Sequence, residues 1–262
     1  MMLKLMQKRP VAAMADASAM RTRGRTRAAS ALAAAALAIL AGMAQAQLQC
    51  ELGILTPETL AGNNPATDAR WKEGEKYRFA FFTSVGTTAL SADIATYNTF
   101  VQNLANASTV YKIGASNGVT WKAIGSTATV NASDNTMTDP HVNGDGHAIF
   151  LLDGKTVVAR NYWDLWDGTI ENIINLTEQG TVQTYWPWTG SYWDGTAAPG
   201  HEFSFAALGG GVQVHQGESA SVTNWIWRMW TADPPENLLN MYAVSEPLSI
   251  KIHLSGAVIL VR

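Results

Sequence analysis

The sequence has little cysteine, few basic residues beyond its first fifth and no long hydrophobic run. Cys50 is the only cysteine among 262 residues, so no disulfide bond can form within the chain. A single cysteine in an oxidising compartment could still link two chains. The oligomeric state is therefore left open by the sequence.

Basic residues are scarce after position 46. Seven of the 18 basic residues but only one of the 21 acidic residues precede Gln47, which leaves 11 basic and 20 acidic residues and a formal charge of −9 for the remainder. An acidic surface without basic clusters does not suit nucleic acids or sulfated polyanions. We therefore expect no nucleic-acid partner.

The longest apolar segment lies near the N-terminus and is too short to span a bilayer comfortably. A basic region at Arg21–Arg27 precedes the apolar residues Ala31–Met43, and Ala44-Gln45-Ala46 has the small-x-small form of a cleavage site. This order is typical of a secretory signal peptide. It predicts a signal peptide over residues 1–46, with Met20 as an alternative start. The protein would then be secreted, extracellular or periplasmic, with no membrane span after cleavage.

Recognisable catalytic motifs are also missing. The chain contains no Gly-x-Ser-x-Gly nucleophile elbow. Paired carboxylates are the remaining route to an enzyme, because glycoside hydrolysis needs two of them facing each other across a cleft. We expect a non-enzymatic binding protein or a component of the extracellular matrix or cell surface. A carbohydrate-active hydrolase is the alternative, with acids drawn from Asp164, Asp167, Glu178, Asp194 and Glu202.

Hydrophobic patterning predicts one α+β domain over residues 75–262, after an irregular lead-in at 47–74. A helix is expected at 91–106, with Ser91 as its N-cap, and a shorter one at 162–166 with Trp163 and Trp166 on one face. The segment 126–146 reads as a long loop. Strands are expected at 77–83, 119–124, 148–152, 156–159, 183–189, 239–244 and 248–261.

The order of these segments is similar to that of a known domain. Ala148-Ile149-Phe150-Leu151-Leu152-Asp153-Gly154, then Trp163-Asp164-Leu165-Trp166-Asp167-Gly168 and Trp188-Thr189-Gly190-Ser191 resemble the endostatin domain of multiplexin collagens. The strings YRFAFFTS, DLWDG and YAVSEPL also resemble secreted bacterial proteins that carry exosortase sorting tails. The resemblance implies a C-type-lectin-like fold with a twisted, mostly antiparallel sheet. The endostatin disulfides and heparin-binding arginines have no counterpart here.

Aromatic residues near a turn form the candidate ligand site. Trp186, Tyr192 and Trp193 precede or adjoin the Asp194-Gly195 turn, and aromatic faces stack well on sugar rings. Trp186 and Trp188 would share one face of a strand, whereas Trp188 and Trp166 are expected in the core. We therefore expect contact with a glycan or an extracellular protein through Trp186, Tyr192, Trp193 and Asp194.

A second candidate site lies in the expected loop. Asp139, Asn143 and Asp145 alternate there beside Gly144, and such oxygen ligands suit Ca²⁺. The pattern departs from an EF-hand because Phe150 stands six positions after Gly144, where that motif needs a glutamate. Ca²⁺ is the one cofactor that the sequence brings into question, and no other is expected.

Overall fold

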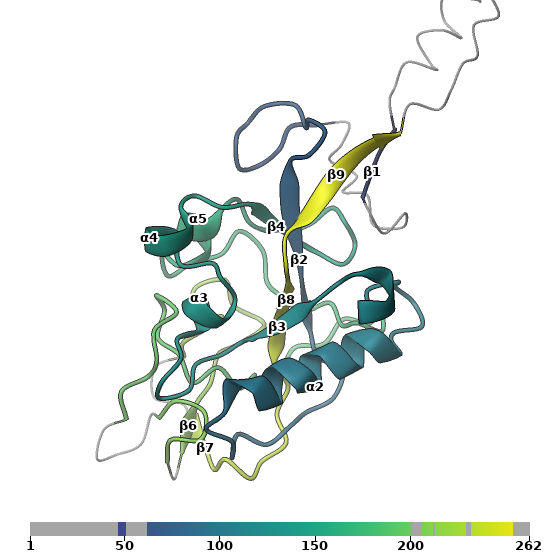
Figure 1. Ribbon diagram of the computed structural model, residues 1–262. Coiled ribbons are helices and arrows are strands. Elements are labelled where there is room, and N and C mark those ends of the chain that lie inside the picture. The colour runs from purple at the N-terminus through teal and green to yellow at the C-terminus, as the bar shows by residue number, and fades with distance from the viewer. Residues whose placement is uncertain (1–46, 51–61, 201–205, 212, 229–231, 254–262) are drawn as a thin grey trace, which may run out of the picture. The chain divides into compact units, whose positions relative to one another are not determined.

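The described part of the chain is built around one mixed sheet, with the long helix α2 (Ile94–Ala107) on one side (Figure 1). The computed structural model describes residues 47–50, 62–200, 206–211, 213–228 and 232–253. The predicted signal peptide and the end of the last expected strand, 254–261, lie outside these residues. Residues 47–253 form one compact unit.

Seven strands make the main sheet within the described residues, with the order β1-β9-β2-β4-β5 and with β8 pairing both β2 and β3. All pairs are antiparallel except β2 with β4. A mostly antiparallel α+β domain is therefore confirmed. The strands are β1 (Gln47–Cys50), β2 (Lys76–Phe82), β3 (Trp121–Ile124), β4 (Ala148–Leu151), β5 (Val157–Ala159), β8 (Tyr242–Ser245) and β9 (Leu248–His253), and a separate pair joins β6 (Val214–His215) to β7 (Ala232–Asp233).

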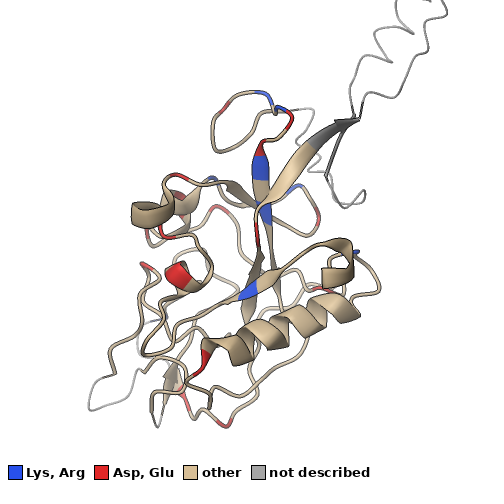
Figure 2. Cartoon of the chain, viewed as in Figure 1, with Lys and Arg blue, Asp and Glu red and all other residues tan. Residues whose placement is uncertain are grey.

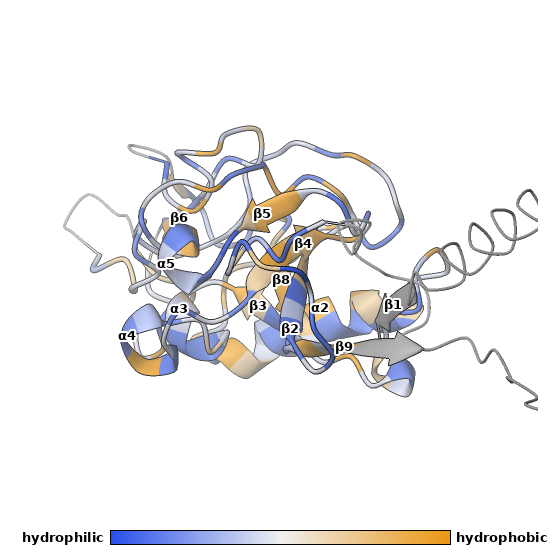
Figure 3. Cartoon of the chain, turned by 90° about the horizontal axis from the view of Figure 1, so that it is seen from above, coloured by the Kyte–Doolittle hydropathy of each residue, from blue (hydrophilic) through white to orange (hydrophobic). Residues whose placement is uncertain are grey.

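Both faces of the sheet are buried. On β2, Phe79 and Phe81 pack with the α2 side of the sheet, while Ala80 and Phe82 pack with the opposite core. In Figure 3 the strands β4 and β5 near the centre are orange, which marks them as hydrophobic. This arrangement explains why Phe79–Phe82 of β2 form a continuous apolar run instead of an alternating one.

The helices in the described ranges are α2 (Ile94–Ala107), the 3-10 turn η2 (Ala115–Asn117), and three single-turn helices, α3 (Ala132–Asn135), α4 (Pro140–Asn143) and α5 (Tyr162–Leu165). In α2 the buried stripe Tyr97, Val101 and Ala105 faces the sheet. The expected long helix is therefore confirmed. Within the described residues no helix is long and apolar enough to cross a membrane.

Four local expectations were wrong. The N-cap of α2 is Asp93 instead of Ser91. The Asp93 side chain accepts a hydrogen bond from the Ala95 N–H, whereas the Ser91 hydroxyl accepts one from the Asp93 N–H, before the helix begins. The segment 126–146 contains the helices α3 and α4. Each is a single turn of mostly polar sequence, so hydrophobic periodicity could not reveal it. The lead-in is not irregular throughout, since β1 pairs with β9. Residues 183–189 form no strand in the described structure, and only isolated bridges fall within them.

A buried arginine ties the small helices to the sheet. Arg78 on β2 is 2% exposed. Its guanidinium donates to the Tyr162 hydroxyl (2.7 Å) and to the carbonyls of Thr136 (2.8 Å), Ser245 (3.0 Å) and Met137 (3.2 Å). Burial lowers the pKa of Arg78. Arg78 thus holds α3 and α5 against one end of β2.

Acid should destabilise the protein through His215. This side chain is fully buried, and burial lowers its pKa from 6.5 to about 3. Between pH 6.5 and pH 3 the His215 ring is therefore protonated in the unfolded chain but neutral in the folded chain. Proton binding to the unfolded chain lowers the free energy of unfolding progressively as the pH falls through this range. We expect a loss of about 3 kcal/mol in unfolding free energy between pH 6.5 and 4.

Urea denaturation at several pH values measures this effect. His147, whose pKa burial lowers to about 4, adds to it in the same direction. His215→Phe should remove about half of the slope, because His147 contributes the rest, whereas His141→Phe, at an exposed position, should leave it unchanged. An unaltered slope in the His215 variant would show that other groups control acid unfolding.

Candidate functional site

A cleft of about 670 Å³ lies beside the three small helices. Four segments line it: residues 131–133 at α3, 139–141 at the start of α4, 160–167 around α5, and the turn 193–196. They are far apart in the sequence, and the tertiary structure brings them together.

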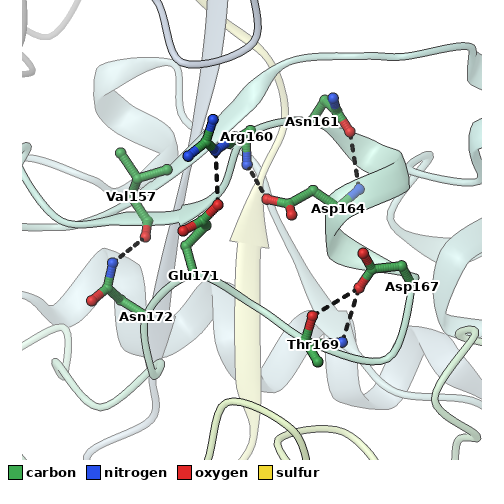
Figure 4. Close-up of polar contacts among 8 residues, drawn as sticks. All are labelled: Val157, Arg160, Asn161, Asp164, Asp167, Thr169, Glu171 and Asn172. Atoms are coloured by element: carbon green, nitrogen blue, oxygen red, sulfur yellow. Dashed lines mark hydrogen bonds and ion pairs between the residues drawn. The ribbon is translucent and has the colours of Figure 1, made fainter.

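Side-chain caps shape α5 at the centre of this cleft. The Asn161 side chain accepts a hydrogen bond from the Asp164 N–H (2.9 Å), and the Asp164 carboxylate accepts one from the Arg160 N–H (2.6 Å; Figure 4). Burial raises the pKa of Asp164, and the negative charges of Glu171 and Asp167 add to this effect, against the opposing hydrogen bond from Arg160. Asp164 is thus both a cap and a partly desolvated acid in the cleft.

Tryptophans form the floor and two walls. Trp166 follows α5, is 5% exposed and donates its indole N–H to the Thr138 hydroxyl (2.9 Å). Trp163 is 46% exposed, donates to Asp145 (3.1 Å) and meets the edge of the His141 ring at 4.8 Å between centroids. Trp193, also 46% exposed, is the other wall. The core position expected for Trp166 is confirmed.

The expectation that Trp163 and Trp166 share one helix face was wrong. The helix is a single turn, and Trp166 is its C-cap, with a φ of −117°. The chain therefore leaves helical geometry before Trp166, which turns inward while Trp163 stays at the surface.

The turn 193–196 is held closely against the floor. Asp194 accepts hydrogen bonds from the Thr196 N–H (3.0 Å) and hydroxyl (2.6 Å). Gly195 has a φ of +78°, and a Cβ there would lie 2.7 Å from a ring carbon of Trp166. Only glycine fits both the conformation and the contact. Trp193 in turn packs near Gly168, at the end of the α5 segment.

The cleft is acidic. Asp139, Asp164, Asp167 and Asp194 line it, and each uses one carboxylate oxygen for a local turn or cap. Within the described chain, the second oxygen of each has no hydrogen bond to protein. Figure 2 shows red acidic segments around α3, α4 and α5, whereas blue segments mark β2 and β3.

The one arginine that lines the cleft is already paired. The Arg160 Nε lies 2.7 Å from Glu171 Oε1, and both side chains are well exposed (Figure 4). This ion pair offsets the positive charge of Arg160 without using a carboxylate that lines the cleft. The free oxygens around the walls are therefore suited to accept hydrogen bonds from hydroxyl or amino groups of a ligand.

The predicted ligand residues are divided between the cleft and another surface. Trp193 and Asp194 line the cleft, but Trp186 and Tyr192 do not. Trp186 lies under the Arg228 guanidinium, 4.6 Å from its ring centroid, and Tyr192 packs edge-on against Trp227 at 5.1 Å. Because 183–189 is not a strand, Trp186 is 49% exposed while Trp188 is fully buried. The expected shared face was wrong, and the core position of Trp188 is confirmed.

The predicted calcium residues take part in separate local contacts. Asp139 accepts a hydrogen bond from the His141 N–H as the cap of α4, whereas Asp145 accepts one from Trp163. Asn143 is exposed at the end of α4. Among the residues that the structure describes, no three His, Cys, Asp or Glu side chains are grouped to hold a metal ion.

The acids considered for a hydrolase do not all lie in the cleft. Asp164, Asp167 and Asp194 line the cleft. Glu178 is fully buried and accepts hydrogen bonds from the Ser84 N–H (3.0 Å) and hydroxyl, so its role is structural. Glu202 lies outside the described residues.

The sequence reading missed Trp163, Ser133 and Asn161 as parts of one site. The Trp-Asp-Leu-Trp-Asp-Gly string contains Trp163, but helix periodicity placed Trp163 on the same face as Trp166, which was expected in the core. Known proteins add no further guide, because no family model and no curated protein sequence matches this chain.

Proposed function

We propose that the protein is a secreted, non-enzymatic carbohydrate-binding protein and that the cleft walled by Trp163 and Trp193 receives the sugar. The observation that carries this proposal is the presence of two half-exposed tryptophans on one cleft. Exposed indole faces provide apolar contact for the C–H face of a sugar ring. The free carboxylate oxygens beside them would accept hydrogen bonds from sugar hydroxyls.

The size of the cleft supports this proposal. A volume of about 670 Å³ falls within the range typical of small-molecule sites. Its floor and one wall come from the α5 segment, which Arg78 anchors through Tyr162. The tryptophans are therefore presented by an ordered base, which reduces the entropy lost on binding.

The fold and location complete the proposal. We propose an endostatin-like, C-type-lectin-like fold, which is compatible with α2 beside a Trp-bearing strand, the β4–β5 hairpin and the short tryptophan helix α5. The signal-peptide pattern supports export, to the periplasm or the cell exterior. Cys50 could join two such chains.

A glycan array with the purified protein tests the function. We expect binding that falls at least tenfold, about 1.4 kcal/mol, in Trp163→Ala and in Trp193→Ala. Trp186→Ala is the matched control, because its ring is equally exposed but lies outside the cleft. Binding that survives all three substitutions, or no binding to any glycan, would contradict the proposal.

The array should be repeated with Ca²⁺ and with a chelator. Since the direct contacts in the cleft involve indole rings and carboxylates, we expect the same glycans to bind in both conditions. Loss of binding on chelation would instead place a cation between the sugar and Asp139.

A carbohydrate-active hydrolase is the second candidate. It is favoured by one observation, namely that the raised pKa of Asp164 occurs in the same cleft as Asp167 and Asp194. Glycoside hydrolysis uses two carboxyl groups on one cleft, of which the general acid has a raised pKa. Release of shorter oligosaccharides by the protein, abolished in Asp164→Asn while binding is retained, would establish the enzyme and overturn the non-enzymatic function.

A further inference from the structure

The cleft carries several negative charges, which binding of a neutral sugar does not require. Four carboxylates line it, and the nearby arginine is engaged by Glu171. Neutral sugars are satisfied by mixed donors and acceptors, whereas this surface is rich in acceptors. An ionised group with several N–H donors would complement it better than a hydroxyl.

The tryptophans point to the same kind of group. The face of an indole ring attracts cations through its quadrupole, and tryptophan is the most effective side chain in this interaction. Trp163 and Trp193 each expose nearly half of their surface on this cleft. A cationic sugar could therefore pack its ring on one indole while its ammonium lies between the indole faces and the carboxylates.

The hydroxyl of Ser133 gives an independent indication that a polar ligand enters. Ser133 lines the cleft and is only 5% exposed. Its N–H donates to the Gly195 carbonyl at 3.3 Å, yet its hydroxyl makes no hydrogen bond to any residue that the structure describes. A hydroxyl that lines a cleft without a protein partner is free to form a hydrogen bond with a ligand. A ligand amine or hydroxyl would provide the partner.

We infer that the cleft selects a sugar with a free amino group, an unacetylated amino sugar carried as its ammonium ion, over the corresponding neutral sugar. This inference rests on the proposed carbohydrate-binding function. It adds that the four aspartates, with the two tryptophans, recognise the positive charge.

Oligomers of one length but different substitution provide the test. Affinities for a glucosamine oligomer, its fully N-acetylated form and a glucose oligomer would be measured by calorimetry with the purified protein at about pH 6, where carboxylates are ionised. We expect the glucosamine oligomer to bind at least tenfold more tightly than the other two. Higher salt should reduce this difference, because charge attraction is screened.

Substitutions assign the preference to the cleft. Asp167→Asn with Asp194→Asn removes two charges but keeps an amide oxygen for each local turn, so we expect the fold to be retained and the preference to fall about tenfold or more. Asp153→Asn is the matched control, since Asp153 caps the β4–β5 turn in the same way, outside the cleft. Ser133→Ala should weaken the glucosamine oligomer severalfold without reducing stability.

The outcomes separate the two proposals. Equal binding of the three oligomers, lost in Trp163→Ala, would overturn the amino-sugar inference and leave the carbohydrate site standing. A preference that persists in the Asp167/Asp194 double variant or in Trp163→Ala would also overturn it, because the acidic chain as a whole would then attract the cation. No binding of any oligomer would count against both.

Discussion

Arg78→Met should lower the free energy of unfolding by about 4 kcal/mol. Methionine retains much of the volume, but it removes four hydrogen bonds to buried oxygens. The carbonyls of Thr136, Met137 and Ser245 and the Tyr162 hydroxyl would each lose the Arg78 donor. A buried acceptor left unpaired costs about 1–3 kcal/mol, and nearby relaxation recovers part of the sum.

Urea denaturation followed by tryptophan fluorescence measures this loss. Arg160→Met is the matched control, since it removes an exposed arginine that has an ion pair on the surface, and such pairs contribute little. We also expect Arg78→Met to weaken ligand binding, because Arg78 anchors α3 and α5. Equal stability of the two variants would contradict this role for Arg78.

Trp188→Ala should destabilise the protein by about 4 kcal/mol, while Trp186→Ala should cost less than about 1 kcal/mol. Trp188 is fully buried, belongs to the core on the α2 side and donates its indole N–H to the Thr87 carbonyl (3.0 Å). Removing it leaves a large cavity and takes one of two hydrogen bonds from the Thr87 carbonyl, which also accepts from the Leu239 N–H (3.1 Å). Trp186 loses only its contact with Arg228 and exposed apolar surface.

The pair is informative because the two residues are of one type and two positions apart. Chemical denaturation of both variants, with far-ultraviolet circular dichroism to confirm folding before urea is added, gives the comparison. Similar losses in the two variants would show that residues 183–189 present both rings to one face, as a strand would.

Strongly periodic segments were predictable because their signal is local. The stripe on α2, the apolar run of β2 and the Asp153-Gly154 hairpin each follow from spacing and turn chemistry within a few residues. The α+β class follows from these segments together. The exact ends of these segments were not predictable. Asp93 and Ser91 are both good N-cap residues, and only the hydrogen bond from the Ala95 N–H to Asp93 distinguishes them.

Segments without a periodic signal were not predictable. The single-turn helices α3 and α4 are too short to show a pattern, and they depend on distant partners such as Arg78 for their position. Residues 183–189 have strand-like composition, but their backbone bonds go to scattered segments, among them Asn175, His215 and Asn240. Tertiary contacts therefore overrode local propensity there.

By itself, the sequence determined the acidic character of the chain after Gln47, the lack of an internal disulfide and the principal strands and helix. These properties depend on composition or on neighbours along the chain. Only the tertiary structure decided that Trp163, Trp193 and four aspartates share a cleft, and that Trp186 does not belong to it. The reason is physical: the cleft is assembled from segments up to about sixty residues apart, and long-range packing around Arg78 and Trp166 sets which side chains remain at the surface.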